Sequence, residues 1–232
     1  MLYQNSMDMS EVRVKEQNFI ARVYGWMSFA LAVTGLVSLY VASNPALVSK
    51  IATGKFLLLG LIIAELGLVI AITSMINRLS FFAASTMFVV YSVLNGVTFS
   101  TIFLVYTMSS IASTFFATAA TFAVMSCYGW YTKKDLTTIG NICFMALIGI
   151  IIASLVNMFL KSSGLYWIIT YAGILIFVGL IAYDTQKIKA MAGNFAINSE
   201  EEKKGALLGA LALYLDFINL FLMLLRIFGQ KK

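Results

Sequence analysis

The chain has 232 residues, of which 61% are hydrophobic and only 11% charged, against about 45–50% and about 25% in a typical soluble domain. This composition excludes an ordinary soluble protein. The net charge of +6 is not gathered into a basic patch with interleaved aromatic residues, so we attribute it to membrane topology and expect no nucleic acid as a partner. Apolar runs of about 20 residues, long enough to cross a hydrocarbon core about 30 Å thick, recur along nearly the whole chain.

Seven such runs follow one another: 19–41, 56–76, 81–106, 111–131, 139–160, 165–183 and 206–228. Their length favours helices, because the strands of a membrane barrel would be about 10 residues long with alternating polarity. We therefore expect an all-α, polytopic integral membrane protein whose seven-helix domain covers 19–228. A cytoplasmic N-terminal tail (1–18) precedes this domain, and a short C-terminal tail (229–232) follows it.

Two local features refine this picture. The only proline, Pro45, falls in the first loop, so no span should carry a proline kink. The fourth run is the least hydrophobic, and small residues recur in it at four-residue spacing, namely Ser113, Ala117 and Thr121. Small residues let helix backbones approach closely, which predicts that this helix packs inside the bundle.

Lysine and arginine are distributed unevenly over the loops, and the richer side of a membrane protein faces the cytoplasm. The first run is too long for a cleavable signal, so we interpret it as an anchor that stays in the membrane. One side collects ten basic residues: Arg13, Lys15, Arg22, Arg78, Lys133, Lys134, Lys187, Lys189, Lys203 and Lys204. The other collects six: Lys50, Lys55, Lys161, Arg226, Lys231 and Lys232. This predicts a cytoplasmic N-terminus and a C-terminus outside.

Several kinds of chemistry lack the residues that they require. The chain has no histidine, which removes the commonest transition-metal ligand and proton shuttle. Cys127 and Cys143 both lie within apolar runs, where an apolar packing role is expected. No glycine-rich phosphate loop occurs, and no serine or cysteine is paired with a base as in a hydrolase. We expect no cofactor.

Three acidic residues lie in or at the end of apolar runs: Glu65, Asp184 and Asp216. Asp216 stands in "LALYLDFINLFLMLLRIF", where a carboxylate at the bilayer centre costs at least about 2.5–3.5 kcal/mol. Glu65 could be protonated and hydrogen-bonded across a helix interface, and Asp184 alone could mark the end of the sixth run. Arg226 and Lys187, near helix ends, are expected to extend toward the headgroups. Asp216 has no such structural explanation, which favours a functional role.

The two aspartates gain meaning together. They lie on consecutive runs, and these helices are antiparallel neighbours if the loop between them folds back. Two carboxyl groups in contact cannot both ionise cheaply, so such a pair would share a proton and titrate as a unit. A proton sensor, a cation site and an aspartyl catalytic dyad all fit this arrangement.

Two sequence strings carry a family resemblance. "AYDTQKI" (182–188) and "LYLDFINLFLMLLRIFG" (213–229) resemble the paired signatures of the Bax inhibitor-1 family, also called the transmembrane Bax inhibitor motif family. The "KKDL" loop (133–136), "VYGWM" at the start of the first run (23–27) and the number of spans agree with it. The resemblance covers essentially the whole chain, and the short form is similar to bacterial members.

The resemblance implies a seven-helix bundle with a central helix and a Ca²⁺ leak that depends on pH, in a bacterial inner membrane. Asp184 and Asp216 match the hydrogen-bonded, pH-sensing pair near the cytoplasmic mouth of the pore. An arginine after the second span is expected to associate with this gate. Arg78 is the only basic residue there, although its spacing from Glu65 departs from the family pattern. Members also bind membrane proteins, including an inner-membrane ATP-dependent protease, a role with no residue signature here.

The residues themselves suit a transported cation. Ca²⁺ prefers six to eight oxygen ligands, and the carboxyls of Asp184, Asp216 and Glu65 are the only acids within apolar runs. Three acids are too few for a tight cage without water and carbonyl groups. We therefore expect a weak transit site on an ion pathway formed by these residues, with Ca²⁺ and H⁺ as the ions.

An enzyme is the minor alternative. Intramembrane aspartyl proteases also carry a Tyr-Asp on one span and a second aspartate on the next, as in Tyr183-Asp184 and Asp216. Their second aspartate follows Gly-x-Gly, whereas Asp216 follows Tyr214 and Leu215. The leading hypothesis is thus a pH-sensitive Ca²⁺ leak channel that is not an enzyme, and the main alternative is an interaction protein that regulates the ATP-dependent protease.

Overall fold

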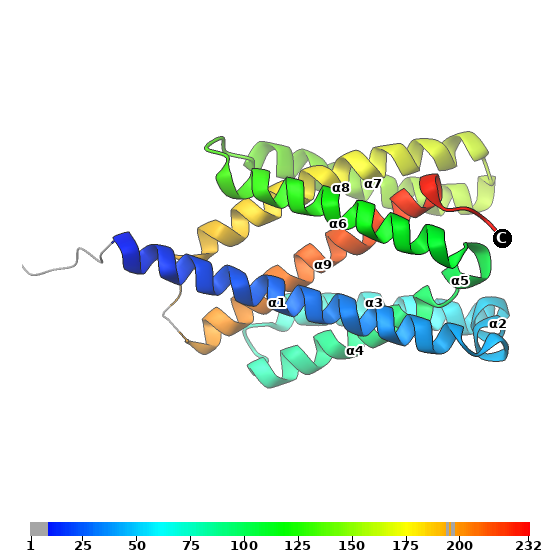
Figure 1. The fold of residues 1–232 in the computed structure, drawn as a ribbon, viewed down its shortest axis with the longest axis horizontal. Coiled ribbons are helices and arrows are strands. Elements are labelled where there is room, and N and C mark those ends of the chain that lie inside the picture. The colour runs from blue at the N-terminus through cyan, green and yellow to red at the C-terminus, as the bar shows by residue number, and fades with distance from the viewer. Residues whose placement is uncertain (1–8, 194, 196–197) are drawn as a thin grey trace, which may run out of the picture. The chain divides into compact units, whose positions relative to one another are not determined.

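The computed structural model describes residues 9–193, 195 and 198–232, and it is built almost wholly of helices (Figure 1). The helices are α1 (Met9–Ala42), α2 (Pro45–Thr53), α3 (Lys55–Met75), α4 (Phe81–Phe99), α5 (Ile102–Val105), α6 (Met108–Tyr131), α7 (Thr137–Leu160), α8 (Ser163–Ala192) and α9 (Glu200–Phe228). Over these described residues no β-strand forms, and the one isolated β-bridge joins Tyr106 to Lys231. The predicted all-α fold is confirmed.

The helices fall into two compact units. The first comprises the described residues of Met1–Thr101 and Lys187–Leu211, and the second comprises Ile102–Gln186 and Ala212–Lys232. Helices α8 and α9 each contribute residues to both units. The units are described separately below.

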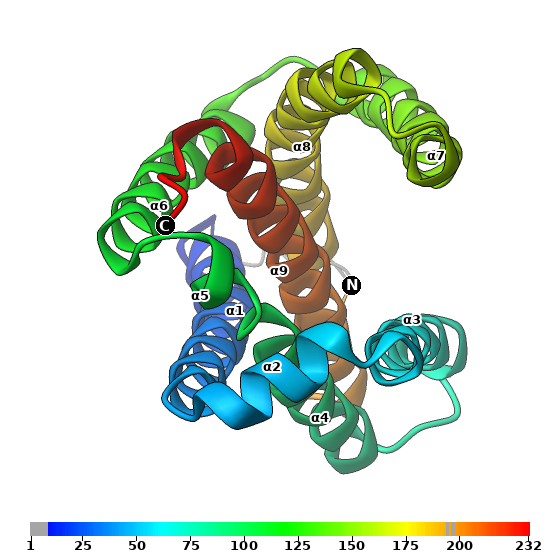
Figure 2. The ribbon, with the colours of Figure 1, turned by 90° about the vertical axis from the view of Figure 1, so that its right-hand side faces the viewer.

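A short helix occupies the loop that was predicted after the first span. The side chain of Asn44 accepts a hydrogen bond from Leu47 N (3.2 Å) and caps α2, and Pro45 takes the first helical position, where its missing N–H costs nothing. Figure 2 shows α2 lengthwise between the ends of α1 and α3. Pro45 therefore starts a helix in the first unit and interrupts no span, as predicted.

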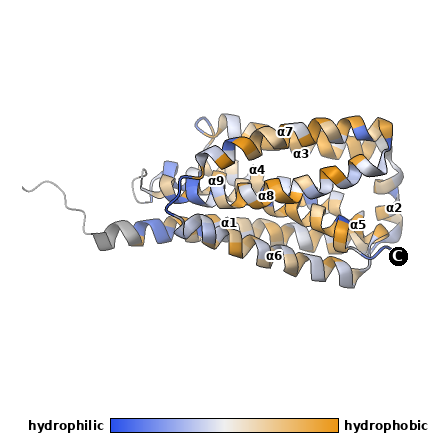
Figure 3. Cartoon of the chain, turned by 90° about the horizontal axis from the view of Figure 1, so that it is seen from above, coloured by the Kyte–Doolittle hydropathy of each residue, from blue (hydrophilic) through white to orange (hydrophobic). Residues whose placement is uncertain are grey.

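Seven segments of the described chain are long and apolar enough to cross a membrane, which confirms the predicted number: Val14–Ala42, Phe56–Met75, Phe81–Val105, Met108–Tyr131, Thr137–Leu160, Ser163–Ala192 and Glu200–Phe228. Figure 3 shows hydrophobic residues along most of α7 and hydrophilic residues near helix ends. The last two helices run further than their apolar runs, because hydrogen bonding along a helix continues through polar residues such as those of Glu200–Lys204.

The third span is interrupted without a proline. Helix α4 ends at Phe99, and α5 begins at Ile102. Between them, the hydroxyl of Ser100 donates to Val97 O (2.6 Å) and that of Thr101 to Thr98 O (2.8 Å). Hydroxyls that bond nearby carbonyl oxygens compete with the backbone ladder and bend or end a helix.

In the first unit, α1 packs closely on α4. A Cβ atom added at Gly96 would lie 2.7 Å from Val37 Cβ and 2.8 Å from Thr34 O, so this crossing requires glycine. Next to it, the hydroxyl of Thr34 donates to Ser92 O (2.9 Å). This bond gives the buried Thr34 hydroxyl a partner at the crossing.

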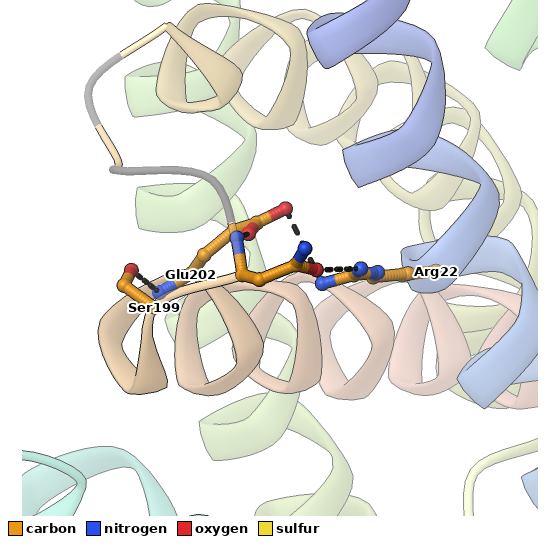
Figure 4. A network of polar contacts seen from close by, with 4 residues as sticks. Arg22, Ser199 and Glu202 are labelled. Atoms are coloured by element: carbon orange, nitrogen blue, oxygen red, sulfur yellow. Dashed lines mark hydrogen bonds and ion pairs between the residues drawn. The ribbon is translucent and has the colours of Figure 1, made fainter.

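The same unit contains an ion pair between α1 and α9 (Figure 4). Arg22 Nη1 lies 3.4 Å from Glu202 Oε1, and Arg22 Nη2 donates to Asn198 Oδ1. Glu202 is only 3% exposed, and its N–H donates to Ser199 Oγ (3.0 Å), which caps α9. Arg22, which the sequence suggested only as a topology signal, therefore also holds the start of α9.

In the second unit, α6 buries a different face from the predicted one. The stripe of Ser113, Ala117 and Thr121 is exposed or half-buried, whereas the buried side chains of α6 include Thr114, Thr118 and Phe122. The ring of Phe217 on α9 packs edge-on against that of Phe122, with 5.6 Å between centroids. The buried face is also made mainly of small residues, among them Ser110, Thr114, Thr118, Ser126 and Gly129, so the expectation was wrong in register only.

Helix α9 is the most buried span. In its most apolar window of 18 residues, 72% are buried, compared with none in α7 and 44% in α8. Most side chains in that window of α9 are therefore covered by protein. Asp216 lies on this helix.

Candidate functional site: the aspartate pair

The carboxyl groups of Asp184 on α8 and Asp216 on α9 form a side-chain hydrogen bond in the second unit. Asp216 is 5% exposed and Asp184 is half-buried. An ionised carboxylate only accepts hydrogen bonds, so a direct bond between two carboxyls requires that one of them carries a proton. A direct bond of this kind therefore depends on a proton shared between the two carboxyls.

One oxygen of this pair is left over. Asp216 Oδ2 is buried, and it has no hydrogen-bond partner among the described residues. A buried acceptor without a partner costs about 1–3 kcal/mol, and such an atom in a native structure calls for an explanation. An ion or water that reaches this oxygen would remove the cost.

Asp184 does not mark the end of its helix. Helix α8 continues to Ala192, more than two turns beyond the predicted end of the apolar run. Around Asp184, the helix is held by α6: a Cβ atom at Gly129 would overlap Ala182 O, and Thr185 Oγ1 donates to Ser126 Oγ (3.4 Å). The close backbone contact allows the polar side chains of α8 to lie inside the unit.

Helix α7 contacts the same part of α8. A Cβ atom at Gly140 would overlap the ring of Tyr183, and one at Gly179 would lie 2.6 Å from Cys143 Sγ. Cys143 is half-buried, and its thiol packs against α8 at Gly179. An apolar packing role for this thiol stays a prediction.

Sequence reasoning missed the role of Gln186. Its Oε1 accepts a hydrogen bond from Leu136 N (2.9 Å), and its Nε2 donates to Lys134 O (2.9 Å). These bonds tie the loop between α6 and α7 to α8, two residues after Asp184. The signal was present in the strings "KKDL" and "AYDTQKI", but nothing in the sequence linked one to the other.

The same loop contains an ordered acid outside the spans. Asp135 Oδ1 accepts hydrogen bonds from Thr137 N (2.9 Å) and Thr137 Oγ1 (2.6 Å) at the start of α7. The hydroxyl and amide donors of Thr137 hold the pKa of Asp135 below its usual range. Asp135 is thus a structural acid.

Glu65 belongs to the first unit and has a neutral partner. It is half-buried on α3, and its Oε1 accepts a hydrogen bond from Thr98 Oγ1 on α4 (2.6 Å). This is the interhelical hydrogen bond considered as one explanation of Glu65. Across the described residues, no three or more His, Cys, Asp or Glu side chains cluster closely enough to hold a metal ion. A pathway that combines Glu65 with the two aspartates stays a prediction.

The basic residues near helix ends differ in their contacts. Arg78 lies in the turn between α3 and α4 in the first unit, is exposed, and makes no side-chain hydrogen bond or ion pair with the described residues. In the second unit, the guanidinium of Arg226 lies 5.1 Å from the centre of the Tyr166 ring, a cation–π contact. The association of Arg78 with the aspartate pair stays a prediction.

The strings that form the aspartate pair also identify the family. The family described as "Inhibitor of apoptosis-promoting Bax1" matches residues 16–232. The chain belongs to the Bax inhibitor-1 family. The predicted resemblance is therefore confirmed over nearly the whole length.

Bacterial relatives of this Bax inhibitor-1 family chain are similar along their full length. The "Inner membrane protein YbhL" of Escherichia coli (strain K12) is 52% identical over 217 residues, which cover 93% of each chain. A Borreliella burgdorferi protein with the name "Uncharacterized protein" is 43% identical over 222 residues, 96% of this chain and 95% of its own. An "Uncharacterized membrane protein" of Streptococcus pyogenes serotype M1 is 38% identical over 216 residues, 92% and 93% of the two chains.

Proposed function

We propose that this Bax inhibitor-1 family protein is a pH-sensitive Ca²⁺ leak channel whose gate is the pair Asp184–Asp216. The observation that carries the proposal is the direct hydrogen bond between two carboxyl groups, one of them buried. The bond needs a shared proton, and loss of that proton would place two like charges in contact. The relative position of α8 and α9 in the second unit is then linked to pH.

Calcium is the ion that suits this gate best. Ca²⁺ takes oxygen ligands, and the buried Asp216 Oδ2 is an oxygen without a hydrogen-bond partner in the described chain. Two carboxyls supply few of the six to eight ligands that Ca²⁺ prefers, so binding is weak and release is fast. Because protons and Ca²⁺ compete for the same oxygens, pH sensitivity follows directly.

The membrane and orientation belong to the proposal. The relative YbhL is named an inner membrane protein, and we place this chain in the same kind of membrane. The excess of basic residues on one side favours a cytoplasmic N-terminus. Glu65 is kept as a further acid along the ion pathway, and Arg78 as a cation associated with the gate.

Purified protein in liposomes that contain a Ca²⁺ dye tests the function. Flux should change several-fold between about pH 5.5 and 8.5, well above the ordinary Asp pKa of about 3.9. Protein-free liposomes and the Asp184→Asn/Asp216→Asn variant serve as controls. Flux that is flat over this range would contradict the gate. The absence of any flux would favour a pure interaction protein, and cleavage of a helical substrate would favour an aspartyl protease.

A further inference from the structure

The loop between α6 and α7 is fixed by a single side chain of α8. Gln186 uses both ends of its amide on the loop backbone: Oε1 accepts from Leu136 N, and Nε2 donates to Lys134 O, both at 2.9 Å. A backbone N–H on one side and a carbonyl on the other determine which end of the amide is oxygen. Leu136 is only 2% exposed, so its side chain anchors the same stretch of loop.

The segment of α8 that carries Asp184 is held on several sides. Ala182 contacts α6 at Gly129, and Tyr183 contacts α7 at Gly140, each so closely that a Cβ atom on the glycine would overlap it. Such contacts prevent a sliding motion of one helix turn independent of its neighbours. A displacement of the Asp184 segment of α8 must therefore carry the loop along or break the bonds of Gln186.

The loop brings charge to this end of the unit. Lys133, Lys134 and Asp135 are exposed and give the loop a net positive charge. On the loop, on α8 around Gln186 and on the ends of α6 and α7 that meet it, the titratable groups are Cys127, Tyr128, Tyr131, Lys133, Lys134, Asp135, Cys143, Tyr183, Asp184, Lys187 and Lys189, and Asp216 faces Asp184 from α9. Two basic side chains near a cation gate raise the local potential, so the position of the loop affects both the proton shared by the aspartates and an approaching cation.

We propose that Gln186 is a positioning residue that fastens the loop Thr132–Leu136 to the Asp184 segment, so that loop and gate move as one piece. The proposal rests on the proposed function, because it concerns the same pair. The proposal adds that the "KKDL" loop belongs to the gate. The two hydrogen bonds of Gln186 couple this loop to the aspartate pair.

The test uses the full chain with Gln186→Leu, which removes both bonds, and Gln186→Glu, which keeps an acceptor for Leu136 N. Gln17→Leu is the matched control, since it makes the same chemical change at an exposed position of α1. Hydrogen exchange of the Leu136 amide should be at least about 10-fold faster in Gln186→Leu than in the wild type. It should be nearly unchanged in Gln186→Glu and in the control.

The second readout is the pH profile of Ca²⁺ flux. Gln186→Leu should displace the pH midpoint by about half a unit or more, and Gln17→Leu should leave it in place. Faster exchange at Leu136 with an unmoved midpoint would overturn the proposal, because the bonds would then be merely structural. If Gln186→Leu does not fold, the midpoint is measured in Gln186→Glu instead. This variant loses the bond to Lys134 O, and an unmoved pH midpoint in it would also overturn the proposal.

Failure of the proposed function gives a different pattern. If the wild type shows no flux, the channel fails, and the coupling is judged by exchange alone. Asp216→Asn should then still change the exchange rate at Leu136, since coupling between two sites is reciprocal. An exchange rate at Leu136 that is insensitive to Asp216→Asn would overturn the coupling whether or not the protein conducts.

Discussion

Two acids in apolar spans have hydrogen-bond partners of different chemistry. In the first unit, Glu65 is half-buried and bonds to the neutral hydroxyl of Thr98 at 2.6 Å. In the second unit, Asp216 is 5% exposed, bonds to another acid, Asp184, and has an oxygen left without a partner in the described chain. Both side chains cost free energy to place in a membrane, but only one is provided with a simple donor.

The difference teaches what to expect of each acid. A hydroxyl donor satisfies an acid and does not change its own charge at neutral pH, so the bond of Glu65 is static. An acid paired with an acid holds together only while a proton is shared, so its bond depends on pH. We therefore expect the Glu65 contact between α3 and α4 to be independent of pH, whether or not ions pass it, and Asp216 to be half of a switch.

The substitution with the largest expected effect tests this comparison directly. Asp216→Asn keeps the volume of the side chain and a hydrogen bond, but it removes the titration. We expect Ca²⁺ flux in liposomes to lose its dependence on pH and to stay at one fixed level. Glu65→Gln, the equivalent change at the other acid, should keep a pH profile like that of the wild type. Loss of the pH profile in Glu65→Gln alone would reverse the two assignments.

The next test asks whether the two aspartates act as a unit. Asp184→Asn should flatten the pH profile as Asp216→Asn does, and the double variant should resemble either single one. Substitutions of two residues that share one proton do not have additive effects on the pH profile, because removal of either partner already abolishes the shared titration. The measurement is the ratio of flux at about pH 5.5 to flux at about pH 8.5 in all four proteins. Two single variants that each retain half of the effect would show independent sites.

A smaller effect is expected where the neutral partner is removed. Thr98→Val keeps the shape of the side chain but leaves Glu65 Oε1 without its donor, which should destabilise the protein by about 0.5–1.5 kcal/mol. Thr98→Ser keeps a hydroxyl and is the matched control. Unfolding in mixed micelles measures the change in free energy, and the pH midpoint of flux should not move. A shifted midpoint in Thr98→Val would place Glu65 in the gate after all.

Much of the fold follows from the sequence, because membrane insertion imposes a simple length rule on apolar segments. The run lengths gave seven spans, and the cost of Asp216 in a bilayer marked the correct helix. The sequence could not reveal which face of each helix is buried. On α6, the spacing of Ser113, Ala117 and Thr121 suggested one buried face, whereas the face that is buried contains Thr114, Thr118 and Phe122.

The contacts of single side chains at the site were also predicted only in part. The apposition of Asp184 and Asp216 was predicted, since it needs only two neighbouring helices. The bonds of Gln186 to residues some 50 positions away in the chain were not, because an amide side chain in a polar stretch has no preferred partner that its neighbours in sequence reveal. Long-range polar contacts depend on where helices end and how closely they cross, as at Gly129 and Gly140.

The smallest expected effect adds a third acid to the comparison, Asp135, which is exposed and bonded to Thr137 N and Oγ1. These donors depress its pKa, so its contribution to stability is present above the unfolded value of about 3.9 and is lost as pH falls through the lower folded value. An NMR titration of the Thr137 amide in micelles should therefore show a midpoint below about 3.9. Asp135→Asn should abolish the titration but keep the amide bond, and its melting temperature should approach that of the wild type as the pH falls below that midpoint. Ca²⁺ flux in this variant should keep its dependence on pH, since Asp135 stays ionised throughout the neutral range and is not the titrating group, and the lost negative charge of the loop should only lower the midpoint slightly. Loss of the pH profile in Asp135→Asn would mean that Asp135 titrates together with the aspartate pair, and the division between satisfied and titrating acids would no longer follow from their hydrogen-bond partners alone.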